Sequence, residues 1–398
     1  MRLLAVTTSF PLRKGSSAGI FVQRLYEHLP EHWRVAVICP DDDGPSRAEA
    51  SRTGRILLHP VRYAPRRWRV LAQQAGGIAS GLDRSRWRIA LVPCMLIALW
   101  WRCLAEARRA DVVHANWAIC GAIAAAAAVP VRRPLVTTLR GDDVTKASSS
   151  VLHRRILGMA VGGSVAVICV SEAMAAALRA LYPERARDVH VCLNGVDHAF
   201  LSVHRSPPVA GRLRVASVGS LIRRKGYDVL IEAIARARSR AAIGLRIAGA
   251  GPELAALREQ AARLDLGDRV EFEGELPPAQ VPLFLAGADV FVLPSRSEGR
   301  PNAVIEALAA GLPVISSDLP GVEGLVEDGV NGWRVQAEDV AALASALDEA
   351  NSNPGERERR AVAARASIRE QGASWAETGA AYDALFRGVL SKLAGSPA

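Results

Sequence analysis

Two short segments in the C-terminal half carry residue types that could hold a phosphorylated small molecule. In the first, Arg223, Arg224 and Lys225 follow an apolar run that ends at Gly219. Three cations at the end of a strand can neutralise a diphosphate without a metal ion. The segment is not a P-loop, because it lacks the pattern GxxxxGK followed by Ser or Thr. The alternative is that these three residues are ordinary solvated charges.

The second segment, residues 289–317, has the pattern of a strand, a polar loop, a short helix and a further strand. Pro301 suits the first turn of that helix and Asn302 is a good cap, so the helix is expected to begin there. The N–H groups around Asn302, Ala303 and Val304, at the positive end of the helix dipole, suit a phosphate. Because the loop and the helix start follow a parallel strand, a ligand is expected at this edge of the sheet.

Two carboxylates, Glu298 and Glu306, flank this helix start. A carboxylate beside a helix-bound diphosphate commonly accepts hydrogen bonds from ribose hydroxyls, which is the role expected for Glu306. Glu298, which lies in the loop, is expected to bind hydroxyls of a sugar. The alternative is that both are surface residues without a ligand.

Short β-type runs alternate with helix-length segments along the chain. Several runs are apolar throughout, as in strands covered on both faces, and the repeated strand–helix–strand order predicts parallel sheets with right-handed crossovers. Residues 197–212, a stretch with Pro and Gly, separate two sets of strands and are interpreted as the domain boundary. The expected strands are Leu3–Thr8, Arg34–Cys39, Asp111–His114, Leu135–Leu139, Val165–Val170, Val189–Leu193, Leu213–Val218, Gly244–Ala248, Arg269–Phe272, Val290–Pro294 and Pro313–Ser317.

Two helical segments near the C-terminus differ in pattern. Residues 351–369 are rich in Arg and Glu and are expected to form a solvated helix rather than an arm that binds nucleic acid. In Trp375–Leu390 the large apolar side chains fall on one stripe, so this final helix is expected to pack against the rest of the fold.

The composition is that of a globular protein. Half of the 398 residues are hydrophobic and 23% are charged, which excludes a disordered or fibrous chain and suggests about two domains. The net charge of +10 attracts polyanions, which are nucleic acid, an anionic lipid surface or a phosphorylated small molecule. The six cysteines form no CxxC pair, which favours reduced thiols in a cytosolic protein.

One region, residues 84–109, resembles a membrane-binding segment. Its apolar part, 89–101, is interrupted by Pro93 and is shorter than the about 20 residues that span a bilayer. Arginines flank this part on both sides. The region is interpreted either as a buried helix with solvated ends or as an interfacial segment that docks on anionic lipid.

Several segments resemble, in the same order, the retaining glycosyltransferases of family 4, which have the GT-B fold and a Glu-x7-Glu signature. Among them are LNGVD, VGSLIRRKGYD, IAGAGPE and EGRPNAVIEA. The resemblance covers nearly the whole chain. It implies an α/β protein with two Rossmann-like parallel-sheet domains that face a central cleft. Residues 1–200 plus 376–398 would form the acceptor-binding domain, onto which the C-terminal helix crosses back, and residues 208–375 the nucleotide-sugar domain.

The resemblance also implies a function. A hexosyl-type transferase would move a sugar from a nucleoside diphosphate sugar, of the UDP or GDP type, to an acceptor hydroxyl with retention. This function fits cell-surface polysaccharide or glycolipid synthesis, with a glycan or a polyprenyl-linked sugar as the acceptor. It also fits a cytoplasmic location, in which residues 84–109 hold the protein at the inner face of the membrane. No cofactor, metal or nucleic acid is expected. The alternatives are a GT-B-like nucleotide-sugar epimerase and a basic membrane- or nucleic-acid-binding protein without catalysis.

The resemblance assigns residues to three groups. The expected catalytic residues are Glu298, Lys225 and Arg223. The expected donor-binding residues are Glu306, Arg224, Gly219, Asn302, Ala303, Val304, Gly274, Glu275 and Leu276. The expected acceptor-side residues are Gly19, His114, Arg140 and Asp142.

The chain departs from the family pattern at two positions. Ser220 stands where the family often has Arg, so Arg223 or Arg224 would take over at the diphosphate. Arg140 stands where the family often has His near the reacting sugar; an arginine cannot accept a proton, so its role would be electrostatic. The alternative for His114 is that it packs beneath the site without touching substrate. The alternative for Asp142 is that it caps the following helix.

Overall fold

The computed structural model describes the chain except residues 13–15, 17, 43–53, 73–77, 79–85, 373 and 395–398. The chain divides into two compact units, Met1–Gly195 with Trp375–Ala398, and Val196–Ser374. The second unit begins at Val196, which bridges to Ser374, and Phe200 is buried in the core of that unit.

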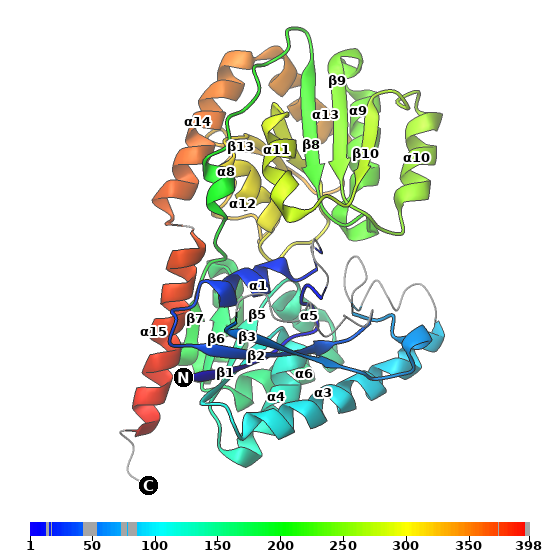
Figure 1. The fold of residues 1–398 in the computed structure, drawn as a ribbon. Coiled ribbons are helices and arrows are strands. Elements are labelled where there is room, and N and C mark those ends of the chain that lie inside the picture. The colour runs from blue at the N-terminus through cyan, green and yellow to red at the C-terminus, as the bar shows by residue number, and fades with distance from the viewer. Residues whose placement is uncertain are drawn as a thin grey trace. The chain divides into compact units, whose positions relative to one another are not determined.

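The first unit is built around a seven-stranded parallel sheet in the order β3-β2-β1-β4-β5-β6-β7 (Figure 1). Its strands are β1 Arg2–Val6, β2 Arg34–Pro40, β3 Ile56–Val61, β4 Val112–Asn116, β5 Leu135–Leu139, β6 Ala166–Cys169 and β7 Val189–Val191. Its helices are α1 Ile20–Glu27, α3 Leu91–Ala107, α4 Ala118–Ala128, α5 Asp143–Ser149, α6 Val151–Gly163, α7 Glu172–Leu181 and α15 Trp375–Ala394.

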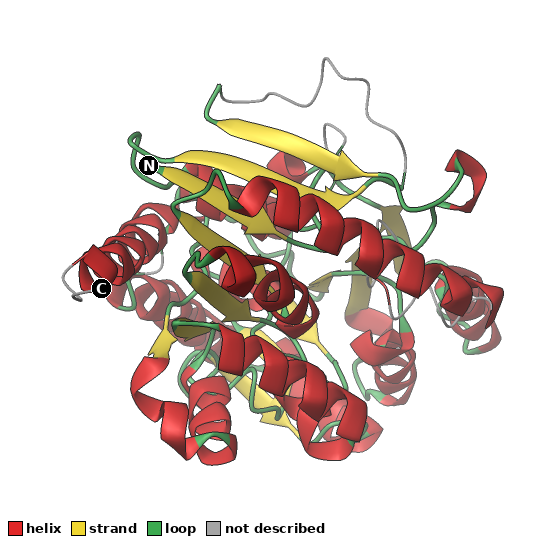
Figure 2. Cartoon of the chain, turned by 90° about the horizontal axis from the view of Figure 1, so that it is seen from below, coloured by secondary structure: helices red, strands yellow, loops and turns green. Residues whose placement is uncertain are grey.

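Apolar strand residues bury both faces of this sheet, as their uninterrupted hydrophobic runs predict. Leu3 and Ala5 pack on one side with residues of α1 and α15, whereas Leu4 and Val6 pack on the other with residues of α3 and α4. Helices therefore flank the strands on both sides, as Figure 2 shows. The predicted apolar stripe of α15 is confirmed, since Tyr382 lies in the same core cluster as Leu3.

The second unit contains a six-stranded parallel sheet in the order β10-β9-β8-β11-β12-β13. Its strands are β8 Leu213–Val218, β9 Ile243–Ala248, β10 Val270–Gly274, β11 Val290–Leu293, β12 Val314–Ser317 and β13 Gly332–Val335. Its helices are α8 His198–Leu201, α9 Tyr227–Arg236, α10 Leu254–Arg263, α11 Val281–Ala286, α12 Asn302–Ala309, α13 Val340–Ser352 and α14 Pro354–Glu370.

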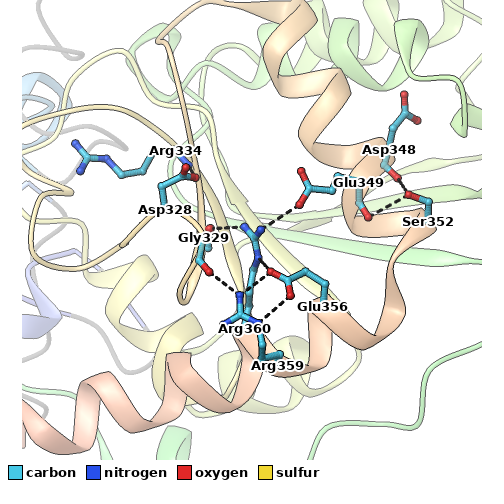
Figure 3. A network of polar contacts seen from close by, with 10 residues as sticks. Asp328, Gly329, Arg334, Asp348, Glu349, Ser352, Glu356, Arg359 and Arg360 are labelled. Carbon is cyan, nitrogen blue, oxygen red and sulfur yellow. Dashed lines mark hydrogen bonds and ion pairs between the residues drawn. The ribbon is translucent and has the colours of Figure 1, made fainter.

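Helix α14 is not the solvated helix that its composition predicted. Arg360 is 6% exposed, and its guanidinium carbon lies 3.9 Å from the centre of the Trp333 ring. The same guanidinium binds Glu349 at 3.0 Å and Glu356 at 2.8 Å and donates to the Gly332 carbonyl at 2.7 Å (Figure 3). A planar group with five donors can stack and bind several partners at once, which allows an arginine to be buried here.

Helix α3 is buried on one side and exposed on the other. Pro93 does not interrupt it, because Pro93 lies in the first turn, where the missing N–H costs nothing. One line of residues spaced by four, from Leu91 to Ala107, is buried against the sheet. On the opposite side Ile97 is 64% and Trp101 67% exposed.

The segment Trp87–Ala107 is 21 residues long, and an 18-residue window of it has a mean hydropathy of 1.6 and is 22% buried, so by length and composition alone it could cross a membrane. Residues 84 and 85, at the start of the 84–109 region, lie outside the described residues.

Candidate functional site

The strand order of the second unit reverses between β8 and β11. The chain runs from β8 outward to β9 and β10 and then returns to β11 on the other side of β8. Loops that follow the two strands at such a point diverge and leave room for a ligand, which is where open α/β sheets bind nucleotides. The loops concerned are residues 219–226 and 294–301, the two that were selected from the sequence.

Close backbone contact holds these two loops together. Gly226 has φ +67°, and a Cβ at this position would lie 1.9 Å from the Pro294 carbonyl oxygen, so only glycine fits. The backbone N–H of Arg296 donates to the Arg224 carbonyl at 2.8 Å. The glycine that follows the three cations therefore fixes their distance from the second loop.

An ion pair joins the two loops through side chains. Nζ of Lys225 lies 2.5 Å from Oε1 of Glu298, and both side chains are largely buried. The Ser295 hydroxyl donates to the same carboxylate oxygen at 2.7 Å. The structure thus brings together Lys225 and Glu298, which are 73 residues apart in the sequence.

The arginines of these two loops differ in their exposure and in their partners. Arg223 is exposed, whereas Arg224 is half-buried and donates to the Ser297 carbonyl at 3.3 Å. Sequence reasoning missed Arg296, which binds Asp228 through two contacts of 2.9 and 2.8 Å and Glu338 at 2.8 Å. Its position directly after Ser295, in the loop already selected, was the available signal.

The start of α12 departs from expectation in two respects. The helix begins at Asn302 itself, after Pro301, and no side chain caps it. The N–H of Val304 donates to the Pro301 carbonyl at 3.1 Å, so it is not a free donor for a phosphate. Asn302 is therefore the first helical residue rather than the cap.

Glu306 lies one turn into α12 and carries a perturbed carboxyl group. Burial, and secondarily repulsion from Asp197, raise its pKa to about 8. Among the described residues no hydrogen bond or ion pair satisfies this carboxyl. A half-buried acid without a partner among the described residues, on the helix that follows the loop of Glu298, is a candidate for binding a ligand hydroxyl.

The other donor-side candidates line the adjoining strand ends. A Cβ at Gly249 would lie 1.9 Å from the Gly219 carbonyl oxygen, so the turns after β8 and β9 touch through their backbones. The N–H of Gly249 donates to the Gly274 carbonyl at 2.7 Å. Glu275, just beyond β10, is exposed, whereas Leu276 packs partly into the core.

The acceptor-side candidates all belong to the first unit. Gly19 has φ +68° and precedes α1, and a Cβ there would lie 2.3 Å from the Ser9 carbonyl oxygen. His114 is fully buried inside β4, with its ring nitrogens 2.9 Å from the Tyr26 hydroxyl and 2.8 Å from the Thr138 hydroxyl. Burial, with the nearby Arg140 charge, lowers the His114 pKa to about 3. This is the packed histidine of the alternative interpretation.

Asp142 and Arg140 lie after β5. The Asp142 side chain makes no cap hydrogen bond to α5 and lies 3.6 Å from Lys146. Its neighbour Asp143 accepts instead from the N–H groups of Ala118 and Arg140, at 3.1 and 2.9 Å. Arg140 itself is 3% exposed.

Within the part of the chain that the structure describes, no group of three or more His, Cys, Asp or Glu side chains is placed to hold a metal ion. The positive charge beside Glu298 comes from Lys225 and the neighbouring arginines.

Comparisons with known proteins match both units. The family model "Glycosyltransferase Family 4" matches residues 18–200, and the model "Glycosyl transferases group 1" matches residues 204–367. The glycogen synthase of Mycobacterium tuberculosis is 30% identical over 380 residues, which cover 92% of this chain and 89% of that protein. The amylovoran biosynthesis glycosyltransferase AmsK of Erwinia amylovora is 34% identical over 169 residues, covering 41% of this chain and 42% of that protein.

Solved structures agree in fold. The crystal structure of Anabaena Alr3699/HepE in complex with UDP and glucose has a TM-score of 0.75, 21% identity and coverage of 100% of both chains. A match of this extent between parallel-sheet units establishes the GT-B fold. Together with the relative that covers the chain almost end to end, it shows that this protein belongs to family 4 of the glycosyltransferases and is a glycosyltransferase.

Proposed function

We propose that this enzyme transfers a hexosyl group from a nucleoside diphosphate sugar, of the UDP or GDP type, to an acceptor hydroxyl in cell-surface polysaccharide or glycolipid synthesis. The observation that carries the proposal is the Lys225–Glu298 pair, which joins the two loops at the strand-order reversal. The complex of HepE with UDP and glucose supports a nucleotide-sugar donor.

Cations of the first loop would hold the donor diphosphate. Lys225 is 14% exposed and lies beside Glu298, while Arg224 lies against Ser297 of the same second loop. Arg223 is exposed to solvent in the free enzyme, so we assign the diphosphate to Lys225 and Arg224. Two fixed cations can offset the charge of the leaving group without a metal ion, which makes a metal-independent reaction the expected one.

Glu306 would bind the ribose. Its half-buried carboxyl has no partner among the described residues and lies on the helix that follows the second loop. A ribose diol offers two O–H donors, which satisfy both oxygens of a carboxylate. The nucleotide base would then lie toward Gly274 and Leu276, at the end of the neighbouring β10.

Retention of configuration is proposed for the transfer step. The bond between the anomeric carbon and the β-phosphate oxygen breaks, and that oxygen takes the electron pair beside Lys225. The acceptor hydroxyl bonds to the anomeric carbon from the same face and gives its proton to the departing phosphate. Glu298, which already accepts from Lys225 and Ser295, would hold sugar hydroxyls rather than act as a nucleophile.

The acceptor is proposed to be a glycan or a polyprenyl-linked sugar at the inner face of the cytoplasmic membrane. The exposed side of α3 carries Ile97 and Trp101, and Trp87 is 50% exposed just before the helix. Arg108 and Arg109 lie exposed at the other end. Exposed apolar side chains next to cations suit the interface of an anionic bilayer.

The test is transfer of labelled sugar. A thermal-shift screen against UDP-, GDP- and ADP-sugars would first identify the donor, and membrane lipid extract would then serve as acceptor. We expect label in the lipid fraction for the native enzyme and a loss of more than about a hundredfold for Lys225→Met. Interconversion of nucleotide sugars without an acceptor would instead establish an epimerase, and activity that survives both Glu298→Ala and Glu306→Ala would disprove the proposed site.

A further inference from the structure

Arg140 is a buried cation that the proposed donor site does not use. It lies directly after β5, and its Nε donates to Oδ1 of Asn116 at 3.0 Å. Its Nη1 donates to Oδ1 of Asn194 at 2.7 Å. Both acceptors are neutral amides, and they hold the guanidinium in place without offsetting its charge.

No carboxylate neutralises this cation within the described residues. Asp143 does contact Arg140, but its carboxylate accepts a hydrogen bond from the backbone N–H of Arg140 and not from the guanidinium. Nη2 of Arg140 is buried and has no hydrogen-bond partner among the residues that the structure describes. A buried charge normally has an ion-pair partner, because burial without one is costly. The protein therefore maintains here a positive charge that lacks its counter-ion.

The groups around the guanidinium are polar but uncharged. Besides the two amides, they include His114, which stays neutral because burial and Arg140 itself keep its pKa low, and the hydroxyls of Tyr26 and Tyr382. Each of these groups is influenced by the Arg140 charge, and none can offset it at neutral pH. The missing negative charge must come from outside the described fold.

Two aromatic side chains lie beside Arg140. The guanidinium carbon lies 5.0 Å from the centre of the Phe21 ring, and this ring meets Trp117 edge-on at 5.9 Å. Trp117 has φ +71° and ψ +151°, a backbone conformation that residues with a side chain rarely adopt. Strain of this kind persists where the surrounding structure requires a particular side-chain position, and it concentrates at ligand sites.

These residues meet where the strand order of the first unit reverses. Residues after β1 lead to Phe21, Trp117 follows β4, and Arg140 follows β5. The reversal lies between β1 and β4, at the edge of the sheet where a ligand of this unit is expected. Two independent features, an uncompensated cation and a strained tryptophan, thus converge on one place.

We propose that Arg140 determines specificity for a substrate sugar that carries an oxyanion, a uronic acid carboxylate or a phosphate, whose ring lies against Trp117 and Phe21. The inference rests on the proposed glycosyl transfer and adds the chemical class of the substrate. A guanidinium pairs with either oxyanion through parallel hydrogen bonds, and an aromatic ring covers the apolar face of a pyranose. Because Nη2 is shielded from solvent, the anion has to displace the groups that cover it.

The sharpest variant is Asn194→Asp, which leaves Arg140 in place and supplies an internal carboxylate where its Nη1 already binds. We expect this variant to melt at a higher temperature than the native enzyme and yet to lose the response to anionic sugars. Arg140→Gln should lose the same response. Arg140→Lys, which keeps the charge, should retain part of it.

The readout is thermal shift with sodium glucuronate, glucose 6-phosphate and glucose at constant ionic strength, with UDP as a separate probe of the second unit. At least one anionic sugar should stabilise the native protein more than glucose, and its apparent affinity should fall roughly tenfold to a hundredfold in Asn194→Asp and Arg140→Gln. Stabilisation by glucuronate would indicate a carboxylate on the substrate sugar, and stabilisation by glucose 6-phosphate would indicate a phosphate. Equal shifts in the native protein and both variants, or no shift by either anion while UDP still stabilises, would overturn the inference. No shift by UDP would count against the donor site instead.

A kinetic comparison then locates the charged substrate. UDP-glucuronate against UDP-glucose tests the donor, and acceptors with and without a uronate or phosphate group test the acceptor. In one of these pairs the native enzyme should prefer the charged member, and Arg140→Gln should abolish the preference. If Arg140→Gln lowers all rates by the same factor, Arg140 has a structural role only.

Discussion

Replacing Glu306 with Gln should remove a pH dependence of donor binding. Burial raises the pKa of this carboxyl to about 8, and Asp197 contributes by repulsion. At pH 7 only about one molecule in ten of the free enzyme then carries the carboxylate. If ribose hydroxyls donate to the ionised form, binding of a nucleotide sugar must first remove this proton.

The size of the effect follows from the pKa. Between about pH 6 and about pH 9 the ionised fraction of Glu306 rises from roughly 1% to nearly all, so the affinity for the donor should rise by up to roughly a hundredfold. UDP-glucose is a suitable probe, because its diphosphate does not titrate in this range, and calorimetry at several pH values measures the slope. In Glu306→Gln the amide oxygen accepts hydrogen bonds at every pH, so the slope should vanish.

The matched control is Asp197→Asn. It removes the like charge that contributes to the raised pKa of Glu306, so the rise in affinity should move to lower pH without losing its amplitude. The stability of the free enzyme should change with pH in the opposite direction to the affinity for the donor. A raised carboxyl pKa in the folded state contributes stability at low pH that is lost as the pH rises toward about 8, and Glu306→Gln should flatten this decline. A flat affinity profile in the native enzyme, or an unchanged slope in Glu306→Gln, would refute the assignment to the ribose.

Three further outcomes are expected. Lys225→Met combined with Glu298→Gln, which avoids an unpaired buried charge, should lower the turnover rate by about a hundredfold or more while the protein stays folded by circular dichroism. Arg360→Met should lower the free energy of unfolding by about 1–3 kcal/mol in urea titrations, because it leaves the buried Gly332 carbonyl without this donor; an unchanged free energy of unfolding would contradict the contacts seen at Trp333 and Gly332. Trp101→Ser should weaken sedimentation with phosphatidylglycerol vesicles by roughly tenfold, whereas Leu283→Ser, at an equally exposed apolar site of the second unit, should have no effect.

Much of the fold could be predicted because its central strands are apolar on both faces. Each of the eleven expected strands corresponds to one in the structure to within about two residues at either end. The two that were missed, β3 and β13, lie at sheet edges. β3 contains Pro60 and the exposed Leu57, and Arg334 interrupts β13, so neither has a continuous apolar run.

Part of the candidate site could also be predicted, because the sequence shows which residues follow each strand. Spacing along the chain placed Glu298 and Lys225 at adjacent strand ends, and the ion pair between them confirms that proximity. The binding of Arg296 to Asp228 and the burial of Arg360 were not predictable, because arginines of an exposed loop and of a polar helix look alike in sequence. Whether such an arginine is buried or ion-paired depends on a partner that is distant in the sequence, and composition does not reveal that partner.

The buried arginine of α14 also has a consequence for how the protein behaves in a crowded solution. β13 is the last strand of its sheet, and an unpaired strand edge can recruit a strand from another molecule. Arg360 donates to the Gly332 carbonyl at the beginning of this strand, and Arg359 donates to the Gly329 carbonyl just before it. Two arginine side chains thus occupy backbone acceptors at the start of this edge strand. The same residues that stabilise this unit therefore also limit intermolecular β-pairing at the start of β13.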